Sequence, residues 1–402
     1  MINTIYTALS GMNAFSKGLD AISNNVANLN TPGFKATVPL FLDVVHRSAA
    51  GALLDASGSS AQGAGVAVNT ENASFNEGEL RSTGNPLDAA VDGAGFFVLQ
   101  NDGQTYYTRA GQFEFDKDGY LVDRTSGARV MVSTSTQALS AFNVDAFRSY
   151  APKATANVTL TGNLGRTGSV TYELPSITVY DTAGGSHVLT AKFVQDGTNP
   201  LKWTVEVHDD KDAVLGTATF EFNSDGTPKA LAAPLVAHLT PTDLPAFDIS
   251  FNLGAAGTYA GVTSLVNDNQ SHLQLLRQDG VAFGSLTTVD FDDKGQLTLH
   301  YSNGEKLTPA TLLLARFTST NELVSVGSGQ YVAPDASGPQ LGTAQSHGLG
   351  RLVGGQVELS NVQLTDQFTD LIIIQRGYQG SSQMASVANE MIQQLLAMGQ
   401  GR

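Results

Sequence analysis

Apolar residues recur every three or four positions at both ends of the chain and every second position between them. Steps of three and four place residues on one face of an α-helix. The sequence therefore predicts a helix over residues 1–29 and a second one from residue 364 to about 396. The two apolar stripes comprise Ile2, Ile5, Leu9, Met12, Phe15, Leu19, Ile22, Val26 and Leu29, and then Leu364, Leu371, Ile374, Tyr378, Ala385, Ala388, Ile392 and Leu395.

The long stretch between the helices has the pattern of β structure. Short alternating runs are separated by Gly, Asp and Asn, as expected for strands joined by tight turns. The predicted fold class is mainly β with terminal helices that pair as a coiled-coil-like inner domain. The predicted parts are an inner assembly domain (1–47 and 356–402), a Gly/Ser linker (48–66), a first β domain (67–149 and 282–355) and an inserted outer β domain (150–281).

Both helices contain glycine, which costs about 1 kcal/mol in a helix interior relative to alanine. Gly11 and Gly18 weaken the first helix, and Gly377 and Gly380 weaken the second. From these residues we expect the C-terminal helix to be kinked, or to be ordered only in a polymer.

Composition narrows the functional classes. Lys+Arg 22 against Asp+Glu 37 gives a net charge of −15, which argues against a nucleic-acid partner. The chain has no cysteine, so disulfides, thiolate nucleophiles and cysteine-ligated metals are excluded. No apolar run is long enough to span a bilayer, and the first residues lack the pattern of a cleaved signal peptide. We expect a protein without membrane insertion, cytoplasmic or exported without a cleaved signal.

Candidate chemistry in the β region is weak. Glu114, Asp116 and Asp118 begin like a calcium loop, but Thr125 stands where a glutamate ligand is expected. Asp and Gly together are more typical of a hairpin turn. A short apolar run followed four residues later by glycine occurs three times, ending at Gly119, Gly226 and Gly295. The seven histidines form no metal-binding pair, and no nucleophile-elbow, P-loop or dinucleotide motif is present. The sequence predicts no enzyme activity, catalytic residue, metal or cofactor.

An apolar helical face usually packs in the core of its own domain. Here the stripes lie at the ends of the chain, and the second is sustained over about four heptads with small residues on it. A long isolated helix is marginal in water and needs a partner. These features favour assembly between copies over catalysis.

Three segments resemble the bacterial flagellar rod and hook axial protein family. The first is Asn24 to Lys35, NNVANLNTPGFK. The second is Asn85 to Phe97, NPLDAAVDGAGFF, followed by YTRAGQF at residues 107–113. The third is LSNVQLT at residues 359–365 with QRGYQ at 375–379. Length and the 150–281 insertion resemble the hook-type members of the family.

The resemblance implies a structural subunit of a curved, flexible hook tube, which acts as a universal joint and transmits torque from rod to filament. It implies an extracellular place in the flagellum and passage through the flagellar type III export apparatus. The partners would be other copies of the chain, together with distal rod, hook cap and hook–filament junction proteins.

Two groups of residues are predicted to matter. The self-assembly residues are Ile5, Leu9, Met12, Leu19, Ile22, Val26, Leu364, Leu371, Ile374, Tyr378, Ala385, Ala388, Ile392 and Leu395. The family-signature residues are Asn25, Asn28, Thr31, Gly33, Phe34, Asn361, Gln375, Arg376, Tyr378 and Gln379.

Two alternatives remain open at this point. One is another rod-like or hook-like axial protein. The other is a secreted carbohydrate-binding β protein, supported by Trp203 near Glu206, Asp209 and Asp210.

Overall fold

The computed structural model describes residues 2–46, 62–69, 72–134, 139–166, 171–231, 233–241, 244–265, 270–334 and 338–400. The chain divides into two compact units. Unit 1 contains residues 1–145, 289–299 and 307–402, and unit 2 contains residues 146–288 and 300–306. The assignment of these parts to an inner assembly domain and outer β domains stays a proposal. The segment 47–61, which includes most of the predicted linker, lies outside the described residues.

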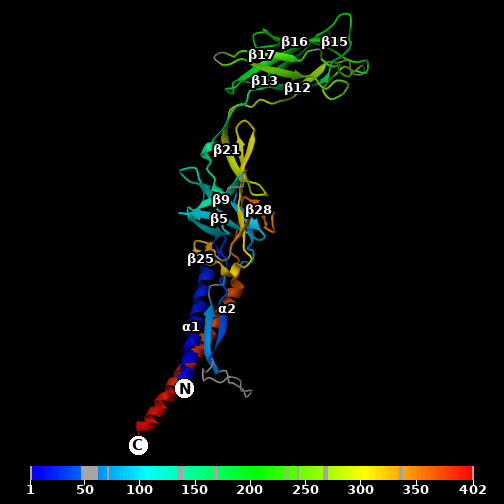
Figure 1. Cartoon of the computed structure of the whole chain (residues 1–402). Helices are drawn as coiled ribbons and strands as arrows, with labels where there is room; N and C mark the ends of the chain where they lie inside the picture. The colour runs from blue at the N-terminus through cyan, green and yellow to red at the C-terminus, as the bar shows by residue number, and fades with distance from the viewer. Residues whose placement is uncertain are drawn as a thin grey trace, which may run out of the picture. The chain divides into compact units, whose positions relative to one another are not determined.

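Helices α1 (Ile2–Ala27) and α2 (Leu364–Gln400) run side by side in opposite directions (Figure 1). Gly11 lies against Ser381, and Gly18 lies against Ile374. In both pairs the residue numbers add to 392, which defines the register of the antiparallel pair. The predicted pairing of the terminal helices is therefore confirmed.

Helix α2 is continuous over 37 residues, including Gly377 and Gly380. The expected kink, or order only in a polymer, stays a prediction, and Gly377 has a packing role. A Cβ atom at Gly377 would lie 2.6 Å from the ring of Phe15 on α1, so glycine provides the room for that ring. The helix-propensity cost of the glycine is offset by the close approach.

Strands β1 (Leu40–His46) and β2 (Gln62–Asn69) form an antiparallel pair, and β2 packs on α1. The backbone N–H of Val66 donates to Oγ of Ser10 at 3.2 Å. Residues 62–66, which the sequence predicted as the end of a Gly/Ser linker, instead belong to β2. The period-two pattern there was hidden because Gly63 and Gly65 occupy alternate positions.

The remaining strands of unit 1 form its β body. They are β3 (Leu80–Ser82), β4 (Ala89–Asp92), β5 (Phe96–Asn101), β6 (Gln104–Thr108), β7 (Phe113–Phe115), β8 (Leu121–Asp123), β9 (Arg129–Thr134), β10 (Leu139–Ala141), β24 (Leu314–Arg316), β25 (Val324–Gly327), β26 (Gln330–Val332), β27 (Gln340–Gly342), β28 (Arg351–Gly354) and β29 (Gln356–Glu358). Strands β9, β5, β6, β26 and β25 are neighbours in one sheet, and β25 lies at its edge. Strands β28 and β29 return late in the sequence to pair with β4 and β3.

Aromatic side chains fill one core of this body. Phe96 contacts Phe75, Phe317 and Tyr331 edge-on, with ring centroids 5.3–6.2 Å apart. Such edge-to-face pairs add to the stabilisation from burial. Burial raises the pKa of Tyr331 to about 12.

Unit 2 is built from two sheets around one hydrophobic core that contains Trp203. One sheet has the order β13 (Thr171–Tyr180), β14 (Ser186–Gln195), β15 (Lys202–His208) and β16 (Val214–Glu221). The other contains β12 (Asn157–Asn163), β17 (Leu235–Leu239), β18 (Phe247–Asn252), β19 (Val262–Thr263) and β20 (His272–Gln278). Strand β11 (Ser149–Tyr150) pairs with β21 (Gly284–Phe291). Strands β21, β22 (Gln296–Tyr301) and β23 (Lys306–Leu312) carry residues of both units.

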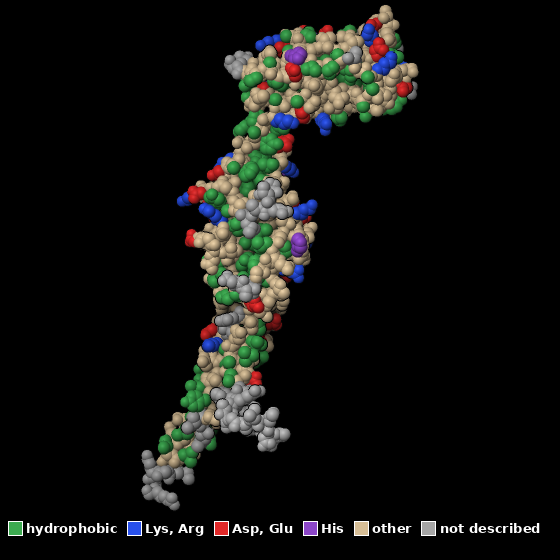
Figure 2. All heavy atoms as spheres, viewed as in Figure 1, with side chains coloured by type: hydrophobic (Ala, Val, Ile, Leu, Met, Phe, Trp, Pro, Cys, Tyr) green, Lys and Arg blue, Asp and Glu red, His purple; other side chains and the backbone are tan. Residues whose placement is uncertain are grey.

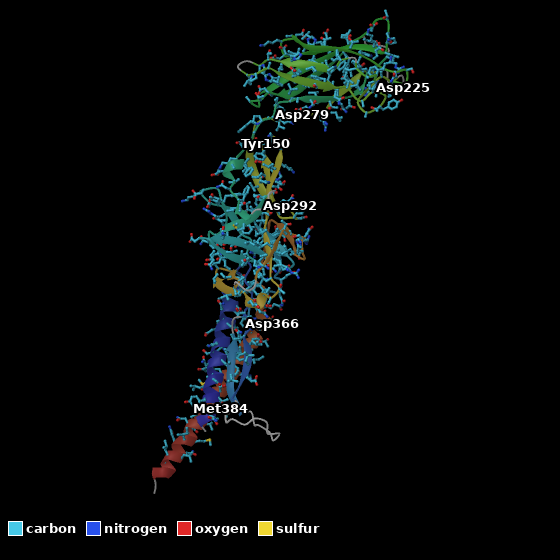
Figure 3. The ribbon with its side chains drawn as sticks, viewed as in Figure 1. Tyr150, Asp225, Asp279, Asp292, Asp366 and Met384 are labelled. Atoms are coloured by element: carbon cyan, nitrogen blue, oxygen red, sulfur yellow. The ribbon has the colours of Figure 1, made fainter. Side chains whose placement is uncertain are left out.

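The three segments that end at Gly119, Gly226 and Gly295 are turns. Oδ1 of Asp116 accepts the N–H of Asp118 and the N–H of Tyr120, and Oδ1 of Asp292, labelled in Figure 3, makes the same kind of bonds to the turn that follows it. Gly119 and Gly295 have φ of 77° and 72°, which glycine adopts at little cost. The carboxylates of Asp116 and Asp292 are therefore engaged in holding their own turns.

Substitution of a buried strand residue in unit 2 should destabilise that unit. Phe193 is 0% exposed and Val194, its neighbour on β14, is 40% exposed. We expect Phe193→Ala to lower the free energy of unfolding by about 3–5 kcal/mol, and the control Val194→Ala to change it far less. Urea unfolding followed by the fluorescence of Trp203, the only tryptophan, measures both. Equal losses in the two variants would contradict this core assignment.

Alkaline pH should weaken unit 1 through Tyr331. An unfolded tyrosine ionises near pH 10, whereas folded Tyr331 keeps its proton until about pH 12. The unfolded state therefore loses a proton first, and stability falls as pH rises through that window, by up to about 2–3 kcal/mol. We expect Tyr331→Phe to lose less stability than the native chain between pH 10 and 12 in thermal melts. An identical pH dependence in both proteins would show that Tyr331 is not the responsible group.

Candidate functional site

The α1–α2 interface is lined on α1 by small residues. Ala8, Gly11, Ala14, Gly18 and Ala21 are all buried, at steps of three and four. Small side chains allow two helix backbones to approach closely. The predicted stripe of α1 consisted of large apolar residues and did not include these small ones, although the same periodicity identifies them when Ala and Gly are counted.

The predicted self-assembly residues differ in solvent exposure. Ile22, Ile374 and Ala388 are buried in the folded chain. Those of intermediate burial are Ile5, Met12, Leu19, Val26, Leu371, Ala385 and Ile392. The exposed ones are Leu9 at 55%, Leu395 at 50%, Leu364 at 39% and Tyr378 at 37%. Only part of the predicted stripe is thus available to another molecule, and its role in assembly stays a proposal.

Helix α2 carries a second apolar stripe, beside the face that packs on α1. It comprises Ile373, Met384, Val387, Met391 and Leu395, which are 48–60% exposed. Figure 3 labels Met384 on this helix, and Figure 2 shows hydrophobic side chains on the visible surface of the helical part. Of these residues only Leu395 was predicted as a self-assembly residue. The rest follow Ile373 at steps of eleven, three and four, which also place residues on one helical face.

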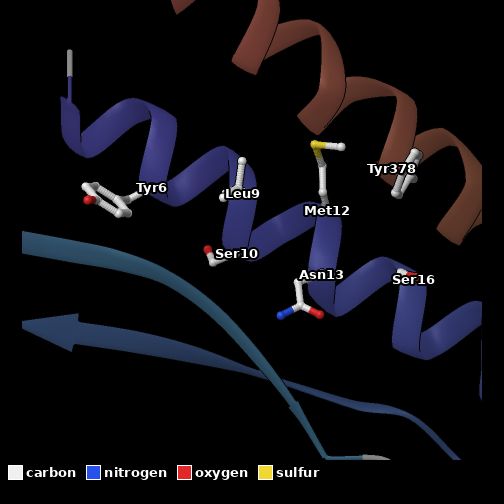
Figure 4. A pocket seen from close by; sticks show the side chains of 7 residues that line it. All are labelled: Tyr6, Leu9, Ser10, Met12, Asn13, Ser16 and Tyr378. Carbon is white, nitrogen blue, oxygen red and sulfur yellow. The ribbon is translucent and has the colours of Figure 1, made fainter.

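A shallow groove runs along the outer side of α1 (Figure 4). Its volume is about 590 Å³, and it is lined by Tyr6, Leu9, Ser10, Met12, Asn13, Ser16 and Tyr378. No lining residue is charged. Tyr6 is 67% exposed, so a large apolar ring borders the groove on the solvent side.

The two helices are joined to the β body by hydrogen bonds of Asn25, which is 1% exposed. Its Nδ2 donates to the carbonyl oxygen of Thr37 and to Oε1 of Gln367, both at 2.8 Å. The N–H of Thr37 donates back to Oδ1 of Asn25 at 2.8 Å. One buried amide thus links α1, α2 and the segment that follows α1.

Asn361 makes the corresponding connection from the C-terminal side. Its Oδ1 accepts the N–H of Ala36 at 2.8 Å. Its Nδ2 donates to the carbonyl oxygens of Ser74 at 2.7 Å and Asn76 at 2.9 Å. Both asparagines were predicted from the family resemblance, and each satisfies buried or partly buried backbone groups.

A buried ion pair lies between these asparagines. Nζ of Lys35 is 2.6 Å from Oε1 of Glu358 and donates to the carbonyl oxygen of Asn76 at 2.7 Å. Nη1 of Arg109 is 3.6 Å from Oε2 of Glu358. Burial lowers the pKa values of Lys35 and Arg109, and the charge of Glu358 opposes both shifts. Glu358 was missed because a lone glutamate 323 residues from Lys35 has no sequence signal.

Gly33 lies in the same region. We name this region the junction, and it consists of Asn25, Gly33, Lys35, Arg109, Glu358 and Asn361. The φ of Gly33 is 69°, and its N–H donates to the carbonyl oxygen of Glu358 at 2.8 Å. A Cβ atom there would lie 2.4 Å from the backbone nitrogen of Ala110. Only glycine fits this conformation and this approach.

The other signature residues are less engaged. Nδ2 of Asn28 donates to the carbonyl oxygen of Asn24, and Oγ1 of Thr31 donates to Oδ1 of Asn28 at 3.1 Å, at the end of α1. The remaining positions are Phe34, half-buried, and Gln375, Arg376 and Gln379, exposed.

The described ranges contain no group of three or more His, Cys, Asp or Glu residues arranged to hold a metal ion. Within the same ranges, no helix is long and apolar enough to cross a bilayer. Trp203 is 0% exposed in the core of unit 2, so it cannot stack on a sugar. The observation that supported the carbohydrate-binding alternative is therefore removed.

Neutralising Glu358 should destabilise unit 1 strongly. Glu358→Gln leaves the ammonium of Lys35 and the guanidinium of Arg109 buried without a carboxylate, which costs about 3–5 kcal/mol. Glu79→Gln, an exposed carboxylate on the same chain segment as β3, serves as the control. Urea unfolding followed by circular dichroism compares the two. A loss of under 1 kcal/mol in Glu358→Gln would show that the buried pair does not hold the junction.

The comparisons with known proteins agree with this geometry. Residues 5–35 match the family model of the flagella basal body rod protein, residues 90–172 that of the flagellar hook protein FlgE/F/G D1 domain, and residues 353–398 that of the flagellar basal body rod FlgEFG protein C-terminal region. The first and third matched ranges cover most of the two helices and include Asn25, Gly33, Lys35, Glu358 and Asn361.

Curated relatives match over nearly the whole chain. The flagellar hook protein FlgE of Borreliella burgdorferi is 27% identical, covering 99% of this chain and 100% of its own length. FlgE of Salmonella typhimurium is 28% identical, covering 97% and 98%. The crystal structure of Helicobacter pylori flagellar hook protein FlgE2 has a TM-score of 0.51 at 13% identity, covering 68% of this chain and 98% of that one, and supports the fold. The chain belongs to the flagellar rod and hook protein family and is a structural hook subunit.

Proposed function

We propose that this hook subunit polymerises through its terminal helices, which bundle with those of neighbouring copies to form the wall of a tube. The observation that carries the proposal is the exposed second apolar stripe of α2, Ile373, Met384, Val387, Met391 and Leu395. Burial of apolar surface contributes about 25 cal/mol per Å², so a stripe of this length provides a driving force for association.

The folded chain already supports this role. The pairing of α1 with α2 occupies one face of α2 and leaves the second apolar stripe in water. A contact that repeats from head to tail without closing generates a filament. The buried junction at Lys35 and Glu358 would transmit force between the helices and the β body without slipping.

The torque-transmitting and bending function is proposed on the same basis. The helices would fix the lattice, while unit 2 and the β body of unit 1 would touch their copies through polar surfaces. Exposed ion pairs and hydrogen bonds are individually weak, so such contacts can exchange as the tube bends.

Partners and location follow from the place of a hook in the flagellum. A tube has two ends, and we propose that distal rod proteins adjoin one end, and hook cap and hook–filament junction proteins the other. The subunits would reach the extracellular end through the flagellar type III export apparatus.

A charge on the second apolar stripe should prevent polymerisation without unfolding the chain. Ile373 is 60% exposed, so Ile373→Glu leaves the α1–α2 pair intact but places a carboxylate in the proposed contact. Gln383→Glu, at an exposed polar position of the same helix, adds the same charge elsewhere. We expect tubes in electron micrographs of the native and Gln383→Glu chains only, with equal thermal melts for all three.

Tubes of Ile373→Glu at the native critical concentration would contradict the terminal-helix mechanism. A fall in the melting temperature confined to this variant would instead show that Ile373 is part of the monomer core.

A further inference from the structure

The register of the helix pair leaves the end of α2 without a partner. Gly11 and Ser381, Gly18 and Ile374, and the hydrogen-bonded Asn25 and Gln367 all have residue numbers that add to 392. Helix α1 begins at residue 2, which lies opposite residue 390. The segment from Met391 to Gln400, here named the overhang, therefore extends past the end of α1 by ten residues, about 15 Å.

The overhang has no charged residue and exposes apolar side chains beside Gln393 and Gln394. It reads MIQQLLAMGQ, and Met391, Leu395 and Leu396 are 48%, 50% and 61% exposed. An unpaired amphipathic helix end of this length is marginal in water. To be stabilised, the overhang needs to pack on a surface that also has no charge.

The groove on α1 fits this requirement (Figure 4). It spans Tyr6 to Ser16, ten residues along the helix and about 15 Å, which equals the length of the overhang. Lys17 and Asp20 are the only charged residues of α1 and lie beyond it. Both surfaces are thus uncharged and of similar length, and each combines exposed apolar side chains with uncharged polar ones.

The overhang cannot reach the groove of its own chain. Helix α2 passes α1 in the opposite direction, and its last ten residues extend away from Tyr6. The occupant must therefore come from another molecule. A second copy supplies the complementary segment in a one-to-one ratio.

We propose that the α2 overhang of one copy docks in the α1 groove of the next. This inference rests on the proposed polymerisation and names the two segments that meet. In copies of the same polarity the overhang runs antiparallel to the receiving α1. When it covers the groove, Met391 lies beside Ser16 and Leu395 beside Met12, so the paired numbers add to 407. The second copy is then shifted by about 15 residues, or about 22 Å, along the helix axis.

Cysteine cross-linking in the polymer tests this contact, because the native chain has no cysteine. The full-length variant Met12→Cys/Leu395→Cys should give a ladder of disulfide-linked multimers after mild oxidation of assembled tubes, and no ladder from the monomer. The matched control Met12→Cys/Gln393→Cys has its second cysteine on the other side of α2, because two positions correspond to about 200°. It should give at least about tenfold less multimer.

The outcomes separate this inference from the proposed function. Tubes that form but give no ladder, or give equal yields with the Gln393 pair, overturn the overhang contact and leave terminal-helix polymerisation intact. Leu395→Glu supplies a second measurement, since a buried unpaired charge is costly. It should raise the critical concentration about tenfold or more, and an unchanged value overturns the inference. Failure of the native chain to form tubes would contradict the proposed function and this inference together.

Discussion

The close approach of α1 and α2 is the interaction on which the rest of the structure depends. Gly11, Gly18 and Gly377 each stand where a Cβ atom would lie less than 3.0 Å from a side chain of the opposite helix. This packing fixes the register of the pair, and the register determines which apolar residues are buried between α1 and α2. The small-residue face of α1 is covered by a different face of α2. The second apolar stripe and the overhang of α2 therefore remain exposed and can contact other copies.

The junction connects this helix pair to the β body of unit 1, so that a force on the helices would be passed to the β body. Asn25, Asn361 and the Lys35–Glu358 pair connect segments more than 300 residues apart. A buried charge pair adds little net stability, but breaking it is costly. Such a connection resists partial separation, which suits a subunit whose two chain ends must remain together in a stressed polymer.

Sequence patterns predicted where the helices and turns lie better than they predicted which residues contact each other. Steps of three and four located both helices, and Asp-Gly pairs located the turns, because these features depend on local geometry. The small-residue interface was missed because alanine and glycine carry little hydrophobic signal. Lys35 lies in the first segment that resembles the family, but Glu358 was not predicted. A pairing between residues far apart in the sequence leaves no local pattern. Residues 62–66 of strand β2 were taken for the end of a linker because glycine occupies alternate positions there.

Electron cryomicroscopy of tubes assembled from the full-length chain is the measurement that tests the central claim most directly. At side-chain resolution the account predicts that the second apolar stripe, including Ile373 and Met384, is buried against helices of neighbouring copies, with the α1–α2 pair of each copy intact. Tubes in which copies touch only through their β domains, with this stripe exposed to solvent, would contradict it.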